Sequence, residues 1–258
     1  MPNKKLKAIL LVAGEGRRLR PYTLDRPKCL VEINKKSLLD RQIEILESEG
    51  INNIVLIGGY KAEMLKNKGN KLKINTKFSE TNMVWTLFSA EEELEGSVIV
   101  SYGDIVYSQE VLKKLINSKE DIAVVIDKDW ESYWRARNED PLDDAETLRV
   151  DQDGRICDIG NRPSTIEEVQ GQYIGLMKFS PKGLSYIKKI FNNSIGNGKL
   201  LNKPIEVAYM TDLLQACINE DFPVSSIEIN GGWVEIDTVS DLHSKTTKER
   251  IEILDKLK

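Results

Sequence analysis

Hydrophobic residues in the first hundred positions form short continuous runs, separated by longer stretches in which apolar and polar residues mix. Three such runs lie at residues 7–13, 53–58 and 97–102. Runs of this kind are typical of strands buried on both faces of a parallel sheet. Residues 38–50 instead place Leu39, Ile43 and Leu46 at helical spacing and end in glycine, which predicts a helix. The alternation predicts βαβ units and an α/β fold with a mostly parallel sheet.

The pattern changes after Asp127, where an aromatic and acidic stretch begins. The remaining predicted elements are helices at 60–68, 82–95, 181–191, 205–219 and 239–257, strands at 72–78, 173–179, 224–229 and 234–236, and a hairpin at 146–158 that turns at Asp153–Gly154. No repeat or linker divides the chain, so we expect a single domain over 1–258, in which about 128–172 forms a small β-rich lid or insertion.

Composition excludes several classes of protein. The 258 residues include 37 Lys and Arg against 41 Asp and Glu, a net charge of −4, which argues against a general surface for nucleic acid. The longest apolar run, residues 8–13, is too short to span a bilayer or to serve as a signal peptide, so we expect a cytoplasmic protein. The one histidine, His243, and three widely spaced cysteines do not suggest a His-dependent triad, a zinc site or a disulfide framework.

The loop after the first predicted strand carries the strongest chemical signal. Between Arg17 and Lys28 it has five cations and one acid, and two glycines, Gly14 and Gly16, precede them. Glycines let backbone amides approach an anion closely, and arginine and lysine add charge-assisted contacts to phosphate oxygens. On composition alone, a solvated basic turn explains the loop equally well.

The order of residues in this loop resembles the signature of the nucleotidyltransferases, a family that includes sugar-1-phosphate nucleotidyltransferases and cytidylyltransferases. The matching strings are residues 13–23, AGEGRRLRPYT, and residues 27–33, PKCLVEI. The resemblance implies a three-layer Rossmann-like fold, Arg18 and Lys28 as catalytic phosphate-binding residues, and a nucleotide-binding backbone. It places that nucleotide-binding role at Ala13, Gly14, Glu15, Gly16, Lys28, Tyr102 and Gly103.

Two carboxylates follow predicted strands, Asp104 after 97–102 and Asp237 after 234–236. Mg²⁺ takes one or two protein carboxylates and completes its shell with phosphates and water. Either aspartate alone is more often a turn cap than a ligand. Both match positions where the family keeps its metal-binding aspartates, so the resemblance implies a Mg²⁺ site at this pair.

Thr81 and Asn82 occupy a turn between a predicted strand and helix. Such residues usually cap helices, but a similar Thr-Asn turn lies beside the base in phosphocholine-type cytidylyltransferases. The resemblance therefore implies that both contact the nucleotide, with CTP as the expected donor. The Gln-x-x-Pro-x-Gly pattern of glucose-1-phosphate thymidylyltransferases is absent from this sequence.

Residues 129–147 combine aromatic and acidic side chains. If helical, 130–137 places Trp130, Tyr133 and Trp134 on one face, which is either a core stripe or a surface for an ammonium-bearing ligand. The stretch resembles cytidylyltransferases that activate phosphocholine, 2-aminoethylphosphonate or phosphoglutamine. We expect acceptor binding by Trp130, Trp134, Arg137, Asp144, Glu146 and Lys178. Lys178, in an apolar strand, is either a phosphate contact or an edge-strand lysine with its ammonium in water.

The resemblance covers about Leu6 to Leu242 and implies transfer of CMP from CTP to a small amine-bearing phosphate or phosphonate, for decoration of a cell-surface polysaccharide or lipid. A sugar-1-phosphate nucleotidyltransferase and a non-catalytic nucleotide-binding module are the alternatives. The expected partners are the two substrates, without nucleic acid or membrane insertion. The final helix, with Ile251, Leu254 and Leu257, docks either on its own domain or on a second subunit of a homodimer.

Overall fold

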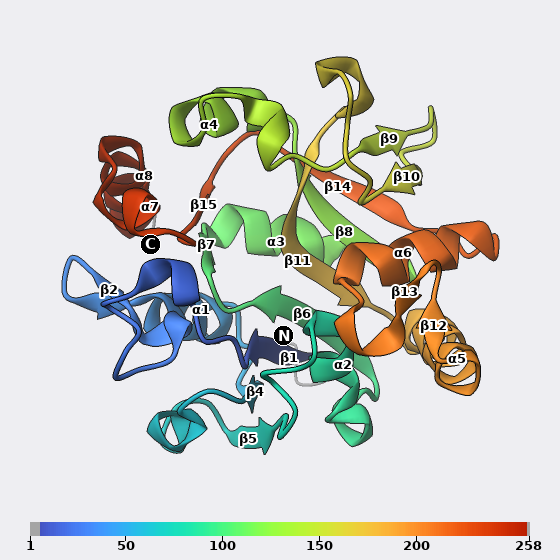
Figure 1. The fold of residues 1–258 in the computed structure, drawn as a ribbon, viewed down its shortest axis with the longest axis horizontal. Helices are drawn as coiled ribbons and strands as arrows, with labels where there is room; N and C mark the ends of the chain where they lie inside the picture. Colours follow the sequence, from blue (N-terminus) through green and yellow to red (C-terminus); the bar gives the residue numbers. More distant parts are fainter. Residues whose placement is uncertain (1–5, 257–258) are drawn as a thin grey trace.

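The computed structural model describes residues 6–256 and arranges them around a seven-stranded sheet (Figure 1). In order across the sheet the strands are β14 (Ser225–Ile229), β8 (Ile122–Asp127), β11 (Gln172–Phe179), β6 (Ser97–Tyr102), β1 (Leu6–Val12), β4 (Asn53–Gly58) and β5 (Lys71–Ile74). Only β11 runs antiparallel to its neighbours, β6 and β8. The sheet is therefore mostly parallel, as the alternating pattern predicts.

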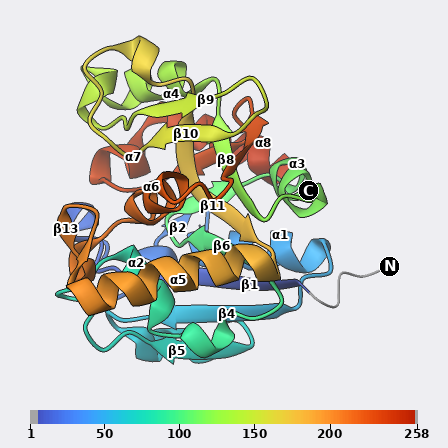
Figure 2. The same cartoon turned by 90° about the vertical axis from the view of Figure 1, so that its right-hand side faces the viewer.

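Helices cover both faces of the sheet and make a three-layer α/β fold. Alternate residues of β1 enter two separate cores: Ala8 and Leu10 face one, Ile9 and Leu11 the other. The first core is closed by α1 (Leu38–Ser48), α3 (Gln109–Asn117), α4 (Trp130–Arg137) and α8 (Lys245–Lys256). The second is closed by α2 (Met83–Phe88), α5 (Pro181–Asn197) and α6 (Met210–Asn219), and Figure 2 brings α5 and α6 to the front.

Residues 128–172 lie as a lobe above one end of the sheet, at the top of Figures 1 and 2, and their buried side chains join both cores. It contains α4 and an antiparallel pair, β9 (Leu148–Val150) and β10 (Ile156–Ile159). The hairpin between these strands turns through Gly154, whose N–H donates to the Asp151 carbonyl. The hairpin predicted from this Asp-Gly turn is thus confirmed.

Three further two-stranded ribbons lie outside the main sheet. They are β2 (Glu32–Ile33) with β3 (Lys36–Ser37), β12 (Lys199–Leu200) with β13 (Lys203–Pro204), and β7 (Ile105–Tyr107) with β15 (Trp233–Glu235). The last ribbon matters most for the site. Strand β7 begins three residues beyond the end of β6, and β15 pairs antiparallel with β7, so the end of β15 lies close to the turn between β6 and β7.

Several predicted helices are shorter than the sequence suggests. The segment 60–68 is a 3₁₀ turn, Ala62–Leu65, because it buries too few side chains to support a helical face. The segment 82–95 divides into α2 and a 3₁₀ turn at Glu91–Glu93. In 205–219, a 3₁₀ turn at Ile205–Val207 precedes α6.

The closing helix is two helices, α7 (Val239–His243) and α8, separated at Ser244. Ser244 is extended and its hydroxyl accepts from the Thr247 N–H, a local bond that starts a new helix. Ile251 and Leu254 are buried against their own domain, and Leu257 lies outside the described residues. No helix among residues 6–256 has the length and apolar character needed to cross a membrane.

Candidate active site

Two adjoining cavities open where β1 and β6 end. The glycine-loop cavity, about 370 Å³, lies over the loop that follows β1. Most of the sequence-predicted nucleotide and metal residues line it: Ala13, Gly14, Gly16, Arg18, Lys28, Thr81, Asn82, Tyr102, Gly103, Asp104 and Asp237. The tryptophan cavity, about 210 Å³, lies beneath the 128–172 lobe and is lined by Trp134, Asp144 and Glu146 among others. Five residues line both cavities: Arg18, Met83, Tyr102, Glu235 and Asp237.

Local backbone geometry places Lys28 in the glycine-loop cavity. Gly16 has a φ of 61°, and a Cβ there would come within 2.9 Å of the Lys28 Cβ, so only glycine allows this approach. Thr23 stabilises the loop, because its hydroxyl donates to the Gly16 carbonyl at 2.8 Å. The Lys28 side chain is only 13% exposed, so the loop presents a largely desolvated ammonium to the cavity.

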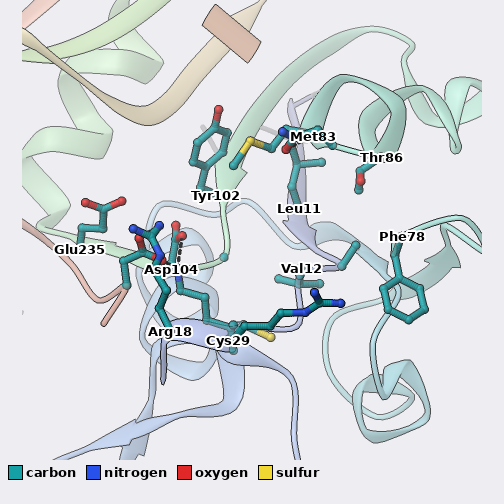
Figure 3. Close-up of a pocket in the computed structure, with 18 of the residues that line it drawn as sticks. Leu11, Val12, Arg18, Cys29, Phe78, Met83, Thr86, Tyr102, Asp104 and Glu235 are labelled. Carbon is teal, nitrogen blue, oxygen red and sulfur yellow. Dashed lines mark hydrogen bonds and ion pairs between the residues drawn. The ribbon is translucent and has the colours of Figure 1, made fainter. Parts of the chain in front are cut away.

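The ammonium of Lys28 joins the two predicted metal-binding aspartates. Its Nζ lies 2.6 Å from Asp104 Oδ2 and 2.5 Å from Asp237 Oδ1. Arg18 also contacts Asp237, from a more exposed position. Figure 3 shows Arg18 and Asp104 at the same end of the cavity. Residues 18, 28, 104 and 237 therefore meet in space although together they span more than 200 positions of the chain.

Backbone register explains why Asp104 and Asp237 meet. Strand β15 pairs antiparallel with β7, Glu235 opposite Ile105, and the Ile236 N–H donates to the Asp104 carbonyl at 3.0 Å. Buried Gln42 fixes the turn before β7, donating to the Tyr102 and Ile105 carbonyls at 2.9 and 2.8 Å. The carboxylates are thus positioned by main-chain and buried amide contacts.

The two carboxylates fit the chemistry of a Mg²⁺ site. Asp104 Oδ1 is buried and lacks a hydrogen-bond partner among the described residues, although a buried carboxylate oxygen normally has one. Within residues 6–256 no cluster of three or more His, Cys, Asp or Glu side chains forms a candidate metal site. A pair of carboxylates beside a cavity suits an ion that takes most of its ligands from phosphates and water.

Glu15 does not line the glycine-loop cavity. Its carboxylate accepts from Arg17 at 2.8 and 3.0 Å and from Arg20 at 3.3 Å, and the bond from Arg17 lowers its pKa. The Glu15 side chain therefore orients neighbouring guanidinium groups, and a nucleotide-binding role for this residue falls on its backbone. Arg17 does line the cavity, which the sequence analysis did not single out.

Thr81 and Asn82 line the cavity, but their polar groups are engaged by the protein. The Thr81 hydroxyl donates to the Lys77 carbonyl at 2.8 Å. Asn82 Oδ1 accepts from the Met83 N–H at 2.9 Å, as a residue at a helix N-terminus does, and its Nδ2 faces the Val207 carbonyl at 3.5 Å. Their side chains thus shape this end of the cavity while also ordering α2.

In the tryptophan cavity, Trp134 and Trp130 occupy different positions. Trp134 lines the cavity, and its buried indole N–H has no partner in the part of the chain that the structure describes. Trp130 lines neither cavity, because its indole N–H donates to the Val169 carbonyl at 3.0 Å within the core. The structure therefore corrects the prediction that Trp130 binds the acceptor. Trp130 belongs to the core stripe instead.

Lys178 also lies away from both cavities. Its ammonium donates to the Ile116 carbonyl at 2.9 Å and to the Ser118 carbonyl, at the end of α3. Burial lowers its pKa. The phosphate-contact interpretation is therefore wrong, and so is the alternative of an ammonium in water: Lys178 satisfies the carbonyls at a helix C-terminus.

Arg137 lines neither cavity and instead contacts residues that flank the site. Its guanidinium donates to Glu235 at 2.7 Å and to Asp241 at 2.9 and 3.2 Å. Asp241 in turn accepts the N–H groups of Asp237 and Thr238, at 3.1 and 2.9 Å. Direct acceptor binding by Arg137 is therefore corrected: it positions the segment that carries Asp237.

Glu146 contributes a carboxyl with a shifted pKa to the tryptophan cavity. Burial and the nearby negative charge of Asp212 raise its pKa to about 7. Lys203, which lies 2.8 Å from Asp212, offsets part of that charge. A cation bound beside Glu146 would favour the ionised carboxylate.

Further lining residues lie outside any contiguous motif. Glu235 lines both cavities, and Phe78 and Thr86 line the glycine-loop cavity. The position of Glu235 could have been predicted from the sequence. Alternate residues of a strand share a face, and Glu235 stands two positions before Asp237. Phe78 and Thr86 carry no such signal.

Residues 8–159 match the family model described as the MobA-like NTP transferase domain. The chain belongs to this family. It is 42% identical over 254 residues to CTP:phosphoglutamine cytidylyltransferase of Campylobacter jejuni, an alignment covering 94% of this chain and 100% of that protein. It is also 44% identical over 99 residues to choline-phosphate cytidylyltransferase of Streptococcus pneumoniae, covering 37% of this chain and 43% of the relative.

Solved structures agree with this assignment. A CTP:phosphocholine cytidylyltransferase from Streptococcus pneumoniae superposes with a TM-score of 0.71 at 25% identity, covering 96% of this chain and 99% of the other. The inositol-1-phosphate CTP transferase from T. maritima superposes with a TM-score of 0.73 at 22% identity, over 96% and 95% of the two chains, which shows a shared fold. The resemblance to nucleotidyltransferases drawn from the loop motif is confirmed.

Proposed function

We propose that this nucleotidyltransferase is a cytidylyltransferase that transfers CMP from CTP to a phosphate or phosphonate oxygen of a small amine-bearing acceptor. One observation carries the proposal: an alignment at 42% identity over nearly the whole chain with an enzyme named for CTP and phosphoglutamine. The two adjoining cavities support it, since they offer room for two substrates that meet at shared walls. The product would serve the decoration of a cell-surface polysaccharide or lipid.

In the proposed reaction an acceptor oxygen attacks the α-phosphorus of CTP. A new P–O bond forms, the bond from the α-phosphorus to the bridging oxygen breaks, and pyrophosphate leaves with that electron pair. A phosphate monoester has a second pKa of about 6, so the nucleophile is already largely ionised at neutral pH. The step therefore needs no general base, and its main requirement is positive charge between two anions.

Lys28 and Arg18 supply that charge from the protein. The Lys28 ammonium is largely buried, where its interaction with a phosphate is less screened than in water. Arg18 lines both cavities, so its guanidinium is placed to contact groups from either substrate. The backbone of residues 13–16 would hold the triphosphate, and Tyr102 and Gly103 form the adjacent wall.

We propose Mg²⁺ as the cofactor, with Asp104 and Asp237 as its protein ligands. When bound, Mg²⁺ would neutralise phosphate oxygens and make the α-phosphorus a better electrophile. Lys28, which contacts both carboxylates in the structure, would then direct its ammonium to the triphosphate.

On the acceptor side, Trp134, Asp144 and Glu146 would hold the amine-bearing part of the substrate. Release of pyrophosphate tests the proposal, with Mg²⁺ and each of phosphocholine, 2-aminoethylphosphonate and phosphoglutamine as acceptor. We expect CTP-dependent turnover with one of them and none after chelation by EDTA. Turnover with glucose 1-phosphate in their place would identify a sugar-1-phosphate nucleotidyltransferase instead.

A further inference from the structure

The acids at the tryptophan cavity differ from their neighbours in having no cation of the protein beside them. Asp144 and Glu146 line the cavity, and neither forms an ion pair with a lysine or arginine among residues 6–256. Asp143, the adjacent residue in the chain, lines neither cavity and does have such a partner, Arg162 at 3.8 Å. The carboxylates that face the cavity are therefore the ones left for a positive ligand.

Glu146 lies in the more negative surroundings of the two. Burial raises its pKa to about 7, and the negative charges of Asp212 and Asp144 add to this effect. Lys203 offsets only part of it, because its ammonium lies 2.8 Å from Asp212. A cation in the cavity would balance the charge that the protein leaves unpaired here.

Trp134 gives independent evidence that a ligand occupies this cavity. Its side chain lines the cavity and is 3% exposed, and its indole N–H has no partner in the part of the chain that the structure describes. An indole N–H can only donate, so it suits an oxygen of the acceptor substrate and cannot bind an ammonium. The positive group of the acceptor is thereby left to the carboxylates.

The aromatic rings in the wall of this cavity are already engaged by the protein. The Arg137 guanidinium lies over the Trp134 ring, 5.1 Å from its centroid, and the Lys203 ammonium lies over the Tyr209 ring at 5.0 Å. Trp233 is only 1% exposed. Quaternary ammonium groups are bound by aromatic faces that are open to them, so these rings are poorly suited to hold one.

A primary ammonium and a trimethylammonium group need different things from a site. The primary ammonium has three N–H donors, which lose their hydrogen bonds to water on binding, whereas the trimethylammonium group has no N–H. An ionised carboxylate can only accept, so it replaces those lost bonds for the primary ammonium alone. A hydrogen bond of this charged kind changes affinity by about tenfold to a hundredfold.

We propose that Glu146 and Asp144 select an acceptor with a primary ammonium group over one with a quaternary ammonium group. Glu146 is the main determinant, because it is the more buried of the two. This inference rests on the proposed function, since it takes the tryptophan cavity as the acceptor site.

Pyrophosphate release with CTP and Mg²⁺ tests the inference on matched acceptors, at pH 8, where Glu146 is mostly ionised. Phosphoethanolamine, 2-aminoethylphosphonate and phosphoglutamine are each compared with the derivative that carries three methyl groups on the amine nitrogen. For phosphoethanolamine that derivative is phosphocholine. In each pair that gives turnover, we expect kcat/KM to be about tenfold or more higher for the primary ammonium.

Variants of the acids locate the source of this preference. Glu146→Met keeps the length of the side chain and removes both acceptor oxygens, so the two kcat/KM values should come within about threefold of each other. Asp144→Ala should reduce the preference about threefold or more. Asp143→Ala is the matched control, because it removes the adjacent acid outside the cavity, and it should keep the wild-type preference. The unfolding temperature reports whether each variant folds.

Two results would overturn the inference and leave the proposed function standing. One is a wild-type enzyme that uses a trimethylammonium acceptor as well as, or better than, its primary counterpart. The other is a folded Glu146→Met variant that keeps the wild-type preference. Absence of CTP-dependent turnover with all six acceptors would refute the proposed function and the inference with it.

Discussion

The two cavities differ in how the chain builds them. The glycine-loop cavity takes its proposed phosphate-binding end from one continuous loop, in which Gly16 packs against Lys28. The tryptophan cavity gathers single side chains from separate elements, including Trp134 of α4, Tyr173 of β11 and Thr211 of α6. A loop with the proposed triphosphate-binding role is constrained over many neighbouring positions, whereas the wall of the proposed acceptor cavity can change one side chain at a time. The loop motif therefore predicts the nucleotide-donor chemistry, whereas no motif in the sequence identifies the acceptor substrate.

The largest expected effect lies on the donor side, at Lys28. Lys28→Ala should lower kcat with CTP by about a hundredfold or more, because it removes a largely buried, preorganised cation from the reacting phosphates. Pyrophosphate release at saturating substrates measures it. Lys182→Ala, on the exposed start of α5, is the control and should keep wild-type turnover. A Lys28→Ala enzyme with near-normal kcat would remove Lys28 from the chemistry.

Arg137 tests how the two regions are joined. Arg137→Gln should lower the free energy of unfolding by about 3 kcal/mol, because it leaves Glu235 and Asp241 without their shared cation. Arg135→Gln on the same helix breaks only an exposed pair with Glu131 and should cost less than about 0.5 kcal/mol. Urea denaturation measures both. Equal free energies of unfolding for the two variants would show that the ion pairs of Arg137 with Glu235 and Asp241 do not stabilise the fold.

Trp134 and Trp130 separate acceptor binding from packing. Trp134→Phe should raise the acceptor KM about tenfold and leave the CTP KM unchanged, since it removes from the tryptophan cavity an N–H that has no partner among residues 6–256. Trp130→Phe loses its bond to Val169, so the unfolding temperature should fall while both KM values stay. The pair of KM measurements decides: a rise in acceptor KM for Trp130→Phe alone would reverse our assignment.

The smallest expected effect is a pH dependence set by Glu146. With a pKa of about 7, this carboxyl is mostly protonated at pH 6 and mostly ionised at pH 8. A cationic acceptor binds the ionised form, so its KM should fall about threefold to tenfold over that range. Glu146→Gln should abolish this part of the profile. The acceptor phosphate ionises in the same way with the wild type and with Glu146→Gln. The ratio of their kcat/KM values at each pH therefore reports the ionisation of Glu146 alone.

Stability provides a second readout for Glu146. Its pKa in the folded state is raised above the ordinary 4.5, so the folded protein loses stability relative to the unfolded chain as pH rises from about 4.5 to 7. Glu146→Gln removes that loss. The difference in unfolding temperature between the variant and the wild type should therefore grow across this window. A constant difference would show that Glu146 titrates normally.

The sequence predicts the parts of this molecule that depend on local order. Apolar runs such as 53–58 and 97–102 match β4 and β6, and the loop motif leads directly to Lys28. Helix ends are predicted less well where a local side-chain bond interrupts the helix, as at Ser244. No element was predicted over 105–127, where β7, α3 and the central strand β8 lie.

Side-chain orientation in space is what the sequence could not supply. Trp130 and Trp134 stand four positions apart on one helix face, yet only Trp134 reaches a cavity. Lys178 suggests a phosphate contact until the fold shows its ammonium at the end of α3. Phe78 and Thr86 belong to no motif, and only the fold shows that they line the glycine-loop cavity. Each case depends on long-range packing.

The cytidylyltransferase activity itself is best tested by pyrophosphate release from the unmodified protein in Mg²⁺. CTP, UTP, dTTP and GTP are each crossed against phosphocholine, 2-aminoethylphosphonate, phosphoglutamine and glucose 1-phosphate. We predict turnover with CTP and one amine-bearing acceptor, and its loss with EDTA. Turnover confined to glucose 1-phosphate, or to a nucleotide other than CTP, would contradict the account.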